Sequence, residues 1–348
     1  MPIRKAVTLQ TIAKELNISL QIVSKALRGK PGMSEFTRQQ IVQTAQRLGY
    51  FTQEQIGSLK LESIAPYPTA VKRFLLVTQA TAPTSYNELL LQGLNDRLSR
   101  FGHQIESLQL PNSVKQSERR EWLQEKGAEY ADGLFIAPVT MQTWGMHLLQ
   151  IAIPRILLSY PQPGTKVDSV VWDVYEAAWE SVTYLLQNGH SNIMYVGDCE
   201  CQPGYILRWQ AFCQAMHDHG LEVDPFQHSK EHRNKQANWT ERLRELIVAA
   251  SPSAILCGVS EEVPVVYDIC RQLGLRVPED ISLIGFLNEQ PEQLPLFTRP
   301  ILPIHQVGYR AADRMLWRIA NPTLPVEHIR IHGDFFVGRT TAARLPAP

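Results

Sequence analysis

The sequence predicts an α/β protein in which a small three-helix head precedes a larger body. Apolar residues recur with a helical period over the first 50 residues, strand-like apolar runs alternate with amphipathic stretches from Arg73 onward, and residues 73–348 are too many for one sheet of that kind. Strand-helix alternation favours parallel strands with helices on both faces. We therefore expect the body to contain two Rossmann-like subdomains with a cleft between them.

The head contains three predicted helices. Thr8 and Ser19 stand at N-cap positions before the first and second helices, and Arg28-Gly29 supplies a stop after the second. Ser34 is the N-cap of a third helix that runs to about Gly49. The apolar stripe of the first helix is Leu9, Ile12, Ala13 and Leu16, and that of the second is Ile22, Val23, Ala26 and Leu27.

The tight connection at Asn17-Ile18 makes the first two helices a candidate helix-turn-helix, the motif that places its second helix in the major groove of DNA. Leu20, Gln21 and Lys25 then point outward. Glutamine makes bidentate bonds to adenine, lysine reaches guanine or phosphate, and leucine contacts a thymine methyl group. The alternative is an ordinary three-helix cap with a solvated face.

Charge is distributed unevenly along a chain whose formal net charge is zero. Residues 1–60 hold nine basic and three acidic residues, a net charge of +6, which leaves −6 on the remainder. A basic head on an acidic body concentrates phosphate affinity at one end, as in a nucleic-acid-binding module.

The body follows residues 62–72, a segment whose two prolines and small residues are typical of a linker. Apolar runs such as FLLV, GLFIA, NIMYVG, SAILCG and ISLIGF alternate with amphipathic stretches such as residues 87–101 and 176–188. Ligands of open α/β sheets bind beyond the carboxyl ends of the strands. A small molecule is therefore expected in the cleft.

Composition and motifs argue against a membrane protein, a metalloprotein and an enzyme. No apolar run approaches the ~18 residues that a membrane span needs, and the start of the chain lacks the apolar core of a secretory signal. We therefore expect a cytoplasmic protein with no membrane partner. No P-loop, dinucleotide fingerprint or serine elbow is present, so neither a cofactor nor a catalytic residue is predicted, and His190 is expected to cap local structure.

The cysteines give no metal-site pattern, although a metal or redox role is the minor alternative. Only Cys199 and Cys201 lie close together, as C-x-C, with no second pair or histidine cluster at zinc spacing. We expect reduced thiols and no metal at the five cysteines, Cys199, Cys201, Cys213, Cys257 and Cys270.

The chain resembles the lactose-repressor (LacI/GalR) family over nearly all of its length. In the head the resemblance lies in V-T-L-x-x-I-A-K-x-L-N-I-S-x-x-x-V-S-K-A-L-x-G from Val7, S-x-x-T-R-x-x-I from Ser34 and A-x-x-L-G-Y ending at Tyr50. In the body it lies in D-G-L-F-I-A-P from Asp132, N-G-H-S-N-I, R-W-Q-A-F, V-P-E-D-I-S-L-I-G-F from Val277 and the closing V-G-R-T-T.

The resemblance implies a domain plan. A helix-turn-helix DNA-binding domain (1–50), a hinge helix (51–61) and the linker (62–72) precede an effector-binding and dimerisation domain of the periplasmic-binding-protein type (73–348). Its N-subdomain is expected at about 73–171 plus 304–331, and its C-subdomain at about 172–303 plus 332–345.

The resemblance also assigns roles in DNA binding. Leu20, Gln21 and Lys25 occupy base-reading positions, and the hinge helix would insert Leu59 into the minor groove. Thr52-Gln53 and Ile56-Gly57 replace the family's usual Pro-Asn and Ala-Arg, and a glycine within a helix costs ~1 kcal/mol relative to alanine, so this hinge should form less readily. The expected phosphate contacts are Thr8, Ser19, Ser24, Thr37 and Arg38.

In the cleft this chain departs from sugar-responsive members of the family. Ser159 stands in place of an aspartate, Val259-Ser260 in place of Asn-Asp, and Leu287 in place of an aspartate. Arg208 matches the family's effector-binding arginine, although it could instead close a salt bridge between subdomains, and the aromatics could be core residues. The candidate effector site is Tyr86, Ser159, Trp172, Asp173, Arg208, Trp239 and Leu287.

These patterns predict a transcription regulator, a repressor that binds a pseudo-palindromic operator as a homodimer and is modulated by a small molecule. The departures predict an effector other than a simple neutral sugar. A carboxylate or phosphate on an aromatic or otherwise apolar body is the hypothesis, and Asp173 or the ligand anion would pair with Arg208; the competing possibility is no effector. A solute-binding receptor and an enzyme are the alternatives from other classes.

Overall fold

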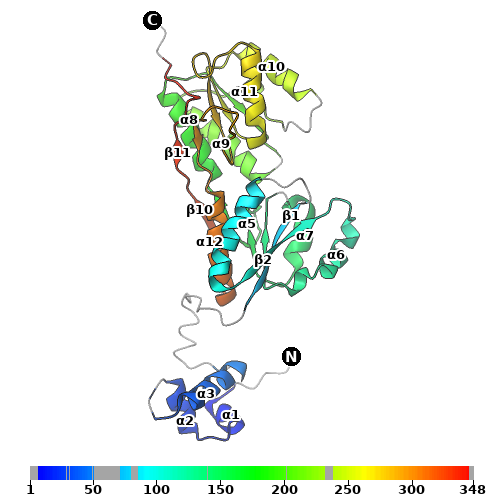
Figure 1. Cartoon of the computed structure of the whole chain (residues 1–348), viewed down its shortest axis with the longest axis vertical. Helices are drawn as coiled ribbons and strands as arrows, with labels where there is room; N and C mark the ends of the chain where they lie inside the picture. Colours follow the sequence, from blue (N-terminus) through cyan, green and yellow to red (C-terminus); the bar gives the residue numbers. More distant parts are fainter. Residues whose placement is uncertain are drawn as a thin grey trace. The chain divides into compact units, whose positions relative to one another are not determined.

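The computed structural model describes residues 7–28, 30, 32–48, 50, 71–79, 85–138, 140–200, 202–231 and 238–344 (Figure 1). The chain divides into two compact units, Met1–Ala65 and Pro66–Pro348, which we call the head and the body. Among the residues described, no helix is long and apolar enough to cross a membrane.

The head folds into three helices, α1 (Leu9–Glu15), α2 (Leu20–Leu27) and α3 (Glu35–Leu48). The hydroxyl of Thr8 accepts from the N–H of Thr11, and that of Ser19 accepts from the N–H of Ile22 at 3.4 Å, so both predicted N-caps are confirmed. Ser34 caps α3 in the same way, by accepting from the N–H of Thr37 at 3.1 Å. The core of the head is Ile12, Ala13, Val23, Ala26, Ile41 and Ala45.

Ile22, which the sequence pattern assigns to the buried apolar stripe of α2, is exposed in the structure. Val23 and Ala26 are buried as expected, but 37% of Ile22 is exposed. Ile22 lies one residue, about 100° of helix rotation, before Val23, and this turns its side chain to the edge of the buried face. The sequence pattern alone does not show which edge of the apolar stripe of α2 is covered by the other two helices.

The first half of the body is built on a six-stranded parallel sheet with strand order β10-β5-β4-β3-β1-β2. Its strands are β1 (Arg73–Gln79), β2 (Gln104–Leu110), β3 (Gly133–Ile136), β4 (Arg155–Leu157), β5 (Asp168–Trp172) and β10 (His328–Ile331). Four helices accompany it: α5 (Ser85–Leu98), α6 (Arg119–Glu125), α7 (Thr140–Gln150) and α12 (Ile304–Ala320). Short 3₁₀ turns are η1 (Ser99–Phe101), η2 (Gln116–Glu118) and η3 (Ala128–Tyr130). We call this half the N-lobe.

The second half, the C-lobe, has a three-stranded parallel sheet of β6 (Ile193–Val196), β7 (Ala254–Cys257) and β8 (Ser282–Gly285). Its helices are α8 (Val174–Gln187), α9 (Pro203–Asp218), α10 (Trp239–Ala250) and α11 (Val263–Gln272) (Figure 1). The 3₁₀ turns η4 (Pro225–Gln227) and η6 (Ser260–Glu262) and a two-stranded antiparallel ribbon, β9 (Arg299–Pro300) with β11 (Phe335–Phe336), complete it.

The chain passes between the lobes three times, because α12 and β10 return to the N-lobe before the last residues rejoin the C-lobe. α12 packs along α5, where glycines allow close approach: a Cβ at Gly93 would lie 1.9 Å from the carbonyl oxygen of His305. The final segment bonds to β8, since the N–H of Ala342 donates to Ser282 Oγ at 3.0 Å. His190 also holds it, because one ring nitrogen lies 2.9 Å from the carbonyl oxygen of Ala342 and the other 3.1 Å from Ser253 Oγ.

A buried charge cluster fixes β10 beside β5. Asp168, 2% exposed, lies 2.6 Å from Arg314 Nη2 and accepts from Arg318 and from the N–H of Glu327. Burial alone would raise the pKa of Asp168, but the hydrogen bonds from Arg318, Glu327 and Arg314 hold it below its ordinary value. The carboxylate therefore stays charged and joins α12 to the starts of both strands.

Candidate functional site

An outward stripe of polar and basic side chains runs along α2. Gln21 and Lys25 are exposed, as predicted, and Arg28 at the C-cap is exposed as well. Residues 21, 25 and 28 share one helix face because they are spaced by four and three positions. The sequence predicts Arg28 only as part of a helix stop, whereas in the structure it adds a second positive charge to this face.

Two apolar side chains flank this stripe at the start of α2. Leu20 is 41% exposed and Ile22 is 37% exposed. In a helix-turn-helix the first turn of the second helix approaches the base edges, where apolar groups contact thymine methyls. The exposure of Leu20 agrees with the role expected for it, and Ile22 is an additional candidate that the sequence prediction placed in the core.

The hydroxyls expected to contact phosphates are engaged within their own helices. Thr8 Oγ1 lies 3.2 Å from Thr11 Oγ1, Ser19 caps α2, and Thr37 Oγ1 lies 2.7 Å from Ser34 Oγ. Ser24 is half-buried in α2. Their structural roles are therefore visible, while contact with phosphate stays a prediction for all four.

Arg38 in α3 forms hydrogen bonds to the end of α2 and to the turn after it. Its Nη1 donates to the carbonyl oxygen of Ala26 at 3.2 Å, and its Nη2 donates to that of Lys30 at 2.8 Å. Both carbonyls belong to the end of α2 and the turn after it. The guanidinium expected to contact phosphate is thus used to fix the second helix against the third. Leu59 and the predicted hinge, 51–61, lie outside the described residues.

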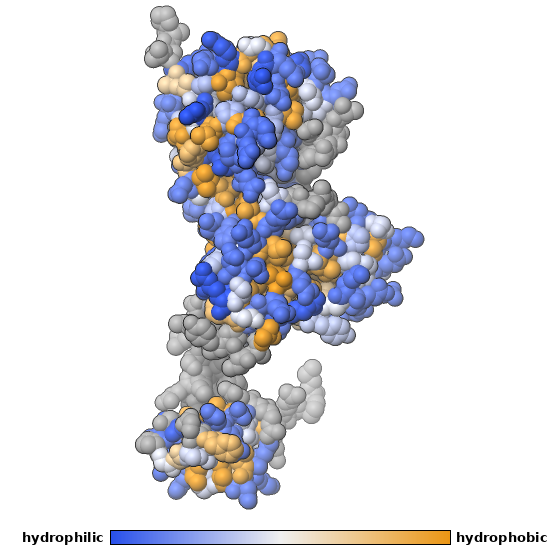
Figure 2. Space-filling model, in the orientation of Figure 1, coloured by the Kyte–Doolittle hydropathy of each residue, from blue (hydrophilic) through white to orange (hydrophobic). Residues whose placement is uncertain are grey.

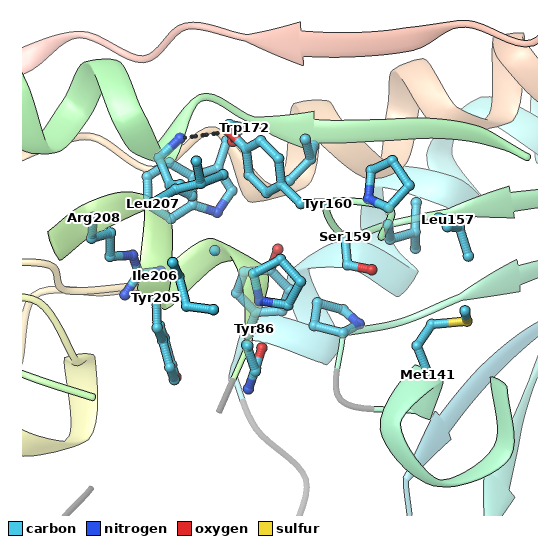
Figure 3. Close-up of a pocket in the computed structure, with 18 of the residues that line it drawn as sticks. Tyr86, Met141, Leu157, Ser159, Tyr160, Trp172, Tyr205, Ile206, Leu207 and Arg208 are labelled. Carbon is cyan, nitrogen blue, oxygen red and sulfur yellow. Dashed lines mark hydrogen bonds between the residues drawn. The ribbon is translucent and has the colours of Figure 1, made fainter. Parts of the chain in front are cut away.

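A cavity of about 780 Å³ lies between the lobes of the body (Figure 3). The N-lobe contributes residues at and after the carboxyl ends of β1, β4 and β5, including Gln79, Ser159 and Trp172. The C-lobe contributes the first turns of α9 and the segments that follow β7 and β8. Such a volume lies within the ~300–1,000 Å³ typical of small-molecule sites.

Four of the predicted effector residues line this cavity together. They are Tyr86, Ser159, Trp172 and Arg208. Figure 3 shows Arg208 and Tyr205 at one side of the cavity, with Leu157 and Met141 at the opposite side. The structure therefore brings the central part of the expected site into one place.

The other three predicted effector residues are not among those that line this cavity. Asp173 caps α8, because its Oδ1 accepts from the N–H groups of Tyr175 and Glu176 at 3.2 Å. Trp239, 3% exposed, packs in the C-lobe core and donates Nε1–H to the carbonyl oxygen of Glu231. Leu287, 1% exposed, belongs to the same core. None of the three lines the cavity with Arg208, and their contact with a ligand stays a prediction.

Arg208 reaches the cavity from α9 between aromatic rings. Its guanidinium carbon lies 5.1 Å from the ring centre of Trp172, 4.8 Å from that of Tyr205 and 5.2 Å from that of Phe286. Nη1 donates to the carbonyl oxygen of Gly258, and Nε is buried without a hydrogen-bond partner.

No carboxylate among the described residues forms an ion pair with the guanidinium of Arg208. Of the two partners expected for Arg208, Asp173 or a ligand anion, Asp173 lies 3.8 Å from Arg330 Nη1 and forms no ion pair with Arg208.

Two tyrosines that line the cavity keep neutral hydroxyls, and two other aromatic rings form a contact between the lobes. Burial raises the pKa of Tyr86 to about 12, although Arg208 and a hydrogen bond with Trp172 act in the opposite direction. Burial, with the charge of Asp173, raises the pKa of Tyr160 to about 12. Trp172 of the N-lobe contacts Phe286 of the C-lobe, with ring centres 6.0 Å apart.

Sequence reasoning missed several lining residues, among them Gln79, Tyr160, Tyr205, Phe286 and Asn288. Gln79 ends β1, and Phe286 and Asn288 follow β8, so position at a strand end was a usable signal. Asn288 also spans the lobes, because its Nδ2 donates to Ser85 Oγ at 3.4 Å.

The described part of the chain holds no group of three or more His, Cys, Asp or Glu side chains able to bind a metal. Cys257 and Cys270 are buried, Cys199 and Cys213 are half-buried, and burial raises the pKa of each of these thiols. Cys201 lies outside the described residues. These four thiols therefore remain protonated at neutral pH, which is unfavourable for metal or redox chemistry.

Comparison with known proteins gives relatives that match along most of the chain. A probable HTH-type transcriptional repressor, ExuR, of Bacillus subtilis is 24% identical over 97% of this chain and 99% of its own length. Catabolite control protein A of Priestia megaterium is 25% identical over 90% of this chain and 93% of its own. A family model of a periplasmic binding protein-like domain matches residues 182–341.

Solved structures share the fold. The transcriptional regulator CelR in complex with cellobiose superposes with a TM-score of 0.67, covering 96% of this chain and 99% of that one at 19% identity. The lac repressor dimer bound to operator and the anti-inducer ONPF gives a TM-score of 0.64, covering 97% and 100% at 16% identity. Both chains thus share the fold of this chain over nearly all of its length.

Proposed function

Because the chain belongs to the lactose-repressor (LacI/GalR) family of DNA-binding transcription regulators, we propose that it represses transcription as a dimer on a pseudo-palindromic operator, under the control of a small molecule in the cleft of its body. The observation that carries the proposal is the exposed face of α2, where Gln21, Lys25 and Arg28 stand in line. Gln21 reads a base in this proposal, and the two cations neutralise phosphates or reach guanine.

Two properties of the chain support a dimer. A single small head makes few base contacts, and two heads on adjacent half-sites multiply specificity. In addition, β2 lies at the edge of the N-lobe sheet and is mostly exposed, with β1 as its described partner. An exposed seven-residue edge strand invites pairing, and a second copy of this chain would cover it. Figure 2 shows hydrophobic residues at the surface of both lobes on one face, which suits such an interface.

The proposal assigns a role to each part of the chain. Residues 1–50 bind DNA, 51–61 form the hinge, 62–72 link it to the body, and 73–348 bind the ligand and dimerise. Leu59 in the hinge inserts into the minor groove, and Gly57 weakens the hinge helix. The regulator acts in the cytoplasm, where its DNA target lies.

The proposed effector is a small molecule other than a simple neutral sugar. A sugar needs several oriented donors and acceptors around its hydroxyls, whereas five aromatic rings line this cavity: Tyr86, Tyr160, Trp172, Tyr205 and Phe286. By changing the separation of the two lobes, the ligand would change the spacing of the two heads.

A mobility-shift experiment tests DNA recognition. The full-length protein is mixed with fragments of the genome that encodes it in the presence of excess random competitor DNA. A repressor retards a small set of fragments, and the retained fraction falls as salt rises. Equal retardation of all fragments would overturn the proposal. If the protein binds its fragments but no compound changes the binding, the effector part fails alone.

A further inference from the structure

We propose that the cavity takes a flat aromatic monocarboxylate whose far end carries a neutral group that both donates and accepts hydrogen bonds. This inference rests on the proposed ligand response of the body and names the chemistry of that ligand. The cavity has two ends of different character, with Arg208 and Tyr205 at one and Met141 and Leu157 at the other (Figure 3).

The Arg208 end is built for negative charge. The guanidinium is held among three rings, its Nε is buried without a partner, and no carboxylate of the described chain pairs with it. The first turn of α9 lines the same end, since Gly204 lies four residues before Arg208 on one helix face. The N-terminal turn of a helix carries partial positive charge and orphan N–H groups. A bound anion would be attracted by this partial charge and would accept hydrogen bonds from these N–H groups.

The charge balance of the lining favours a carboxylate over a phosphate. Arg208 is the one cationic side chain among the described lining residues, and the charged groups otherwise are Glu200 and Glu261, both exposed. A phosphate monoester carries close to two negative charges at neutral pH. A dianion would exceed the single cation and be repelled by both glutamates, whereas one carboxylate matches the guanidinium fork.

The aromatic walls of the cavity favour a flat ring. Tyr86 and Tyr160 line the cavity together with Trp172, Tyr205 and Phe286, the three rings that surround Arg208. Aromatic rings stack in offset or edge-to-face arrangements worth ~0.5–1.5 kcal/mol beyond the area they bury. A planar aromatic body therefore gains more from these walls than a puckered, hydroxylated ring.

Gln79 sets the chemistry of the other end. It is 8% exposed at the end of β1, its Oε1 accepts from Thr143 Oγ1 at 2.8 Å, and its Nε2 donates to Asn112 Oδ1. A carboxamide has two N–H donors and two acceptor lone pairs, so one of each remains. The two bonds fix the orientation of the amide on α7 and on the segment after β2. A ligand carboxamide or lactam edge would pair with the remaining N–H and lone pair.

Matched small acids test the proposal on the full-length protein by thermal shift and calorimetry. The probes are benzoate, its neutral isostere benzamide, 4-carbamoylbenzoate and phenyl phosphate. We expect benzoate to bind at least about tenfold more tightly than benzamide or phenyl phosphate, and 4-carbamoylbenzoate about tenfold more tightly again. Failure of both acids to bind, or phenyl phosphate binding most tightly, overturns the proposal.

Two variants separate the two ends of the ligand. Arg208→Gln should abolish the preference for benzoate over benzamide. Gln79→Leu should remove the advantage of 4-carbamoylbenzoate over benzoate. If Gln79→Leu lowers the melting temperature without ligand, Gln79→Met takes its place, because it keeps the length of the side chain, adds no charge and loses the amide donor and acceptor. An advantage that survives both Gln79 variants overturns the role of Gln79.

A mobility shift with operator DNA on the same preparations keeps this inference separate from the proposed function. Intact operator binding without acid binding refutes the ligand class alone. If the unmodified protein does not recognise operator DNA, the proposal that it is a repressor is refuted.

Discussion

The hydroxyl of Tyr195 occupies the space that a side chain at Gly258 would need. A Cβ built on Gly258 would lie 2.5 Å from Tyr195 Oη, and this hydroxyl is buried without a hydrogen-bond partner. Tyr195 lies in β6 and Gly258 directly follows β7, the neighbouring strand of the C-lobe sheet, and the carbonyl oxygen of Gly258 accepts from Arg208 of the cavity. Tyr195 and Gly258 are therefore a matched pair.

This pair predicts a rescue. Gly258→Ala alone should destabilise the body by about 1–3 kcal/mol, because the added methyl group collides with a fully buried ring. Tyr195→Phe removes the hydroxyl, leaves no partner unsatisfied, and should be neutral or stabilising. The double variant should recover most of the loss when unfolding is followed in urea. A double variant no more stable than Gly258→Ala would contradict the pairing.

Arg38 should be important for the fold of the head rather than for DNA alone. Arg38→Ala removes two hydrogen bonds to carbonyl oxygens of Ala26 and Lys30 and should cost about 1–2 kcal/mol of head stability. Faster hydrogen exchange of amides in α2 and α3 of the full-length protein would report it. The matched control is Arg28→Ala, which should leave exchange unchanged, weaken binding to all DNA sequences and reduce the salt slope by about 1. Unchanged hydrogen exchange in Arg38→Ala would show that these two hydrogen bonds do not stabilise the head.

Gln21 should determine one base pair in each half-site. Gln21→Ala removes a side chain suited to bidentate bonds with adenine and should cost about 1–3 kcal/mol on the preferred operator. Binding titrations with operators substituted at each position would locate the relaxed base pair. Equal losses on operator and random DNA would remove Gln21 from the set of base-reading residues.

His228 should make the stability of the C-lobe depend on pH. Burial, and to a lesser degree Lys230, lowers its pKa to about 4, and its Nδ1 accepts from the N–H of Tyr195 at 3.0 Å. An unfolded histidine has a pKa near ~6.5, so the neutral ring stabilises the fold above that pH, and this stability is lost as pH falls from about 6.5 towards 4. The contribution is of the order of 2–3 kcal/mol.

The control for this prediction is His228→Asn, which keeps an acceptor for Tyr195 and removes the titration. Between pH 7 and pH 4.5 the free energy of unfolding should fall more steeply in the unmodified protein than in the variant. Other buried histidines, such as His190, contribute equally to both. Parallel pH profiles would show that His228 is not responsible.

Local chemistry was predictable from the sequence, and packing between distant segments was not. The N-caps Thr8, Ser19 and Ser34 follow from hydroxyls placed before helical patterns, and the structure has all three. Strand-helix alternation likewise predicted the parallel sheets. These features depend on residues within a few positions of one another.

The cleft shows where such reasoning fails. Successive residues after a strand point to opposite sides. Phe286 lines the cavity, whereas Leu287, one residue later, is buried in the core. The sequence predicts Trp239 as a wall of the site, but its position in α10 places it in the same core. Gln79 acquires its role from Thr143 and Asn112, which are 64 and 33 residues away.

Selection from random-sequence duplex DNA tests the central claim most directly. The full-length protein is incubated with the pool, bound DNA is recovered and sequenced, and the number of chains per bound duplex is measured. A dimeric repressor should enrich an inverted repeat of two half-sites occupied by two chains, and Gln21→Ala should relax the same position in each half. Recovery of no motif, or of one asymmetric site occupied by a single chain, would contradict the account.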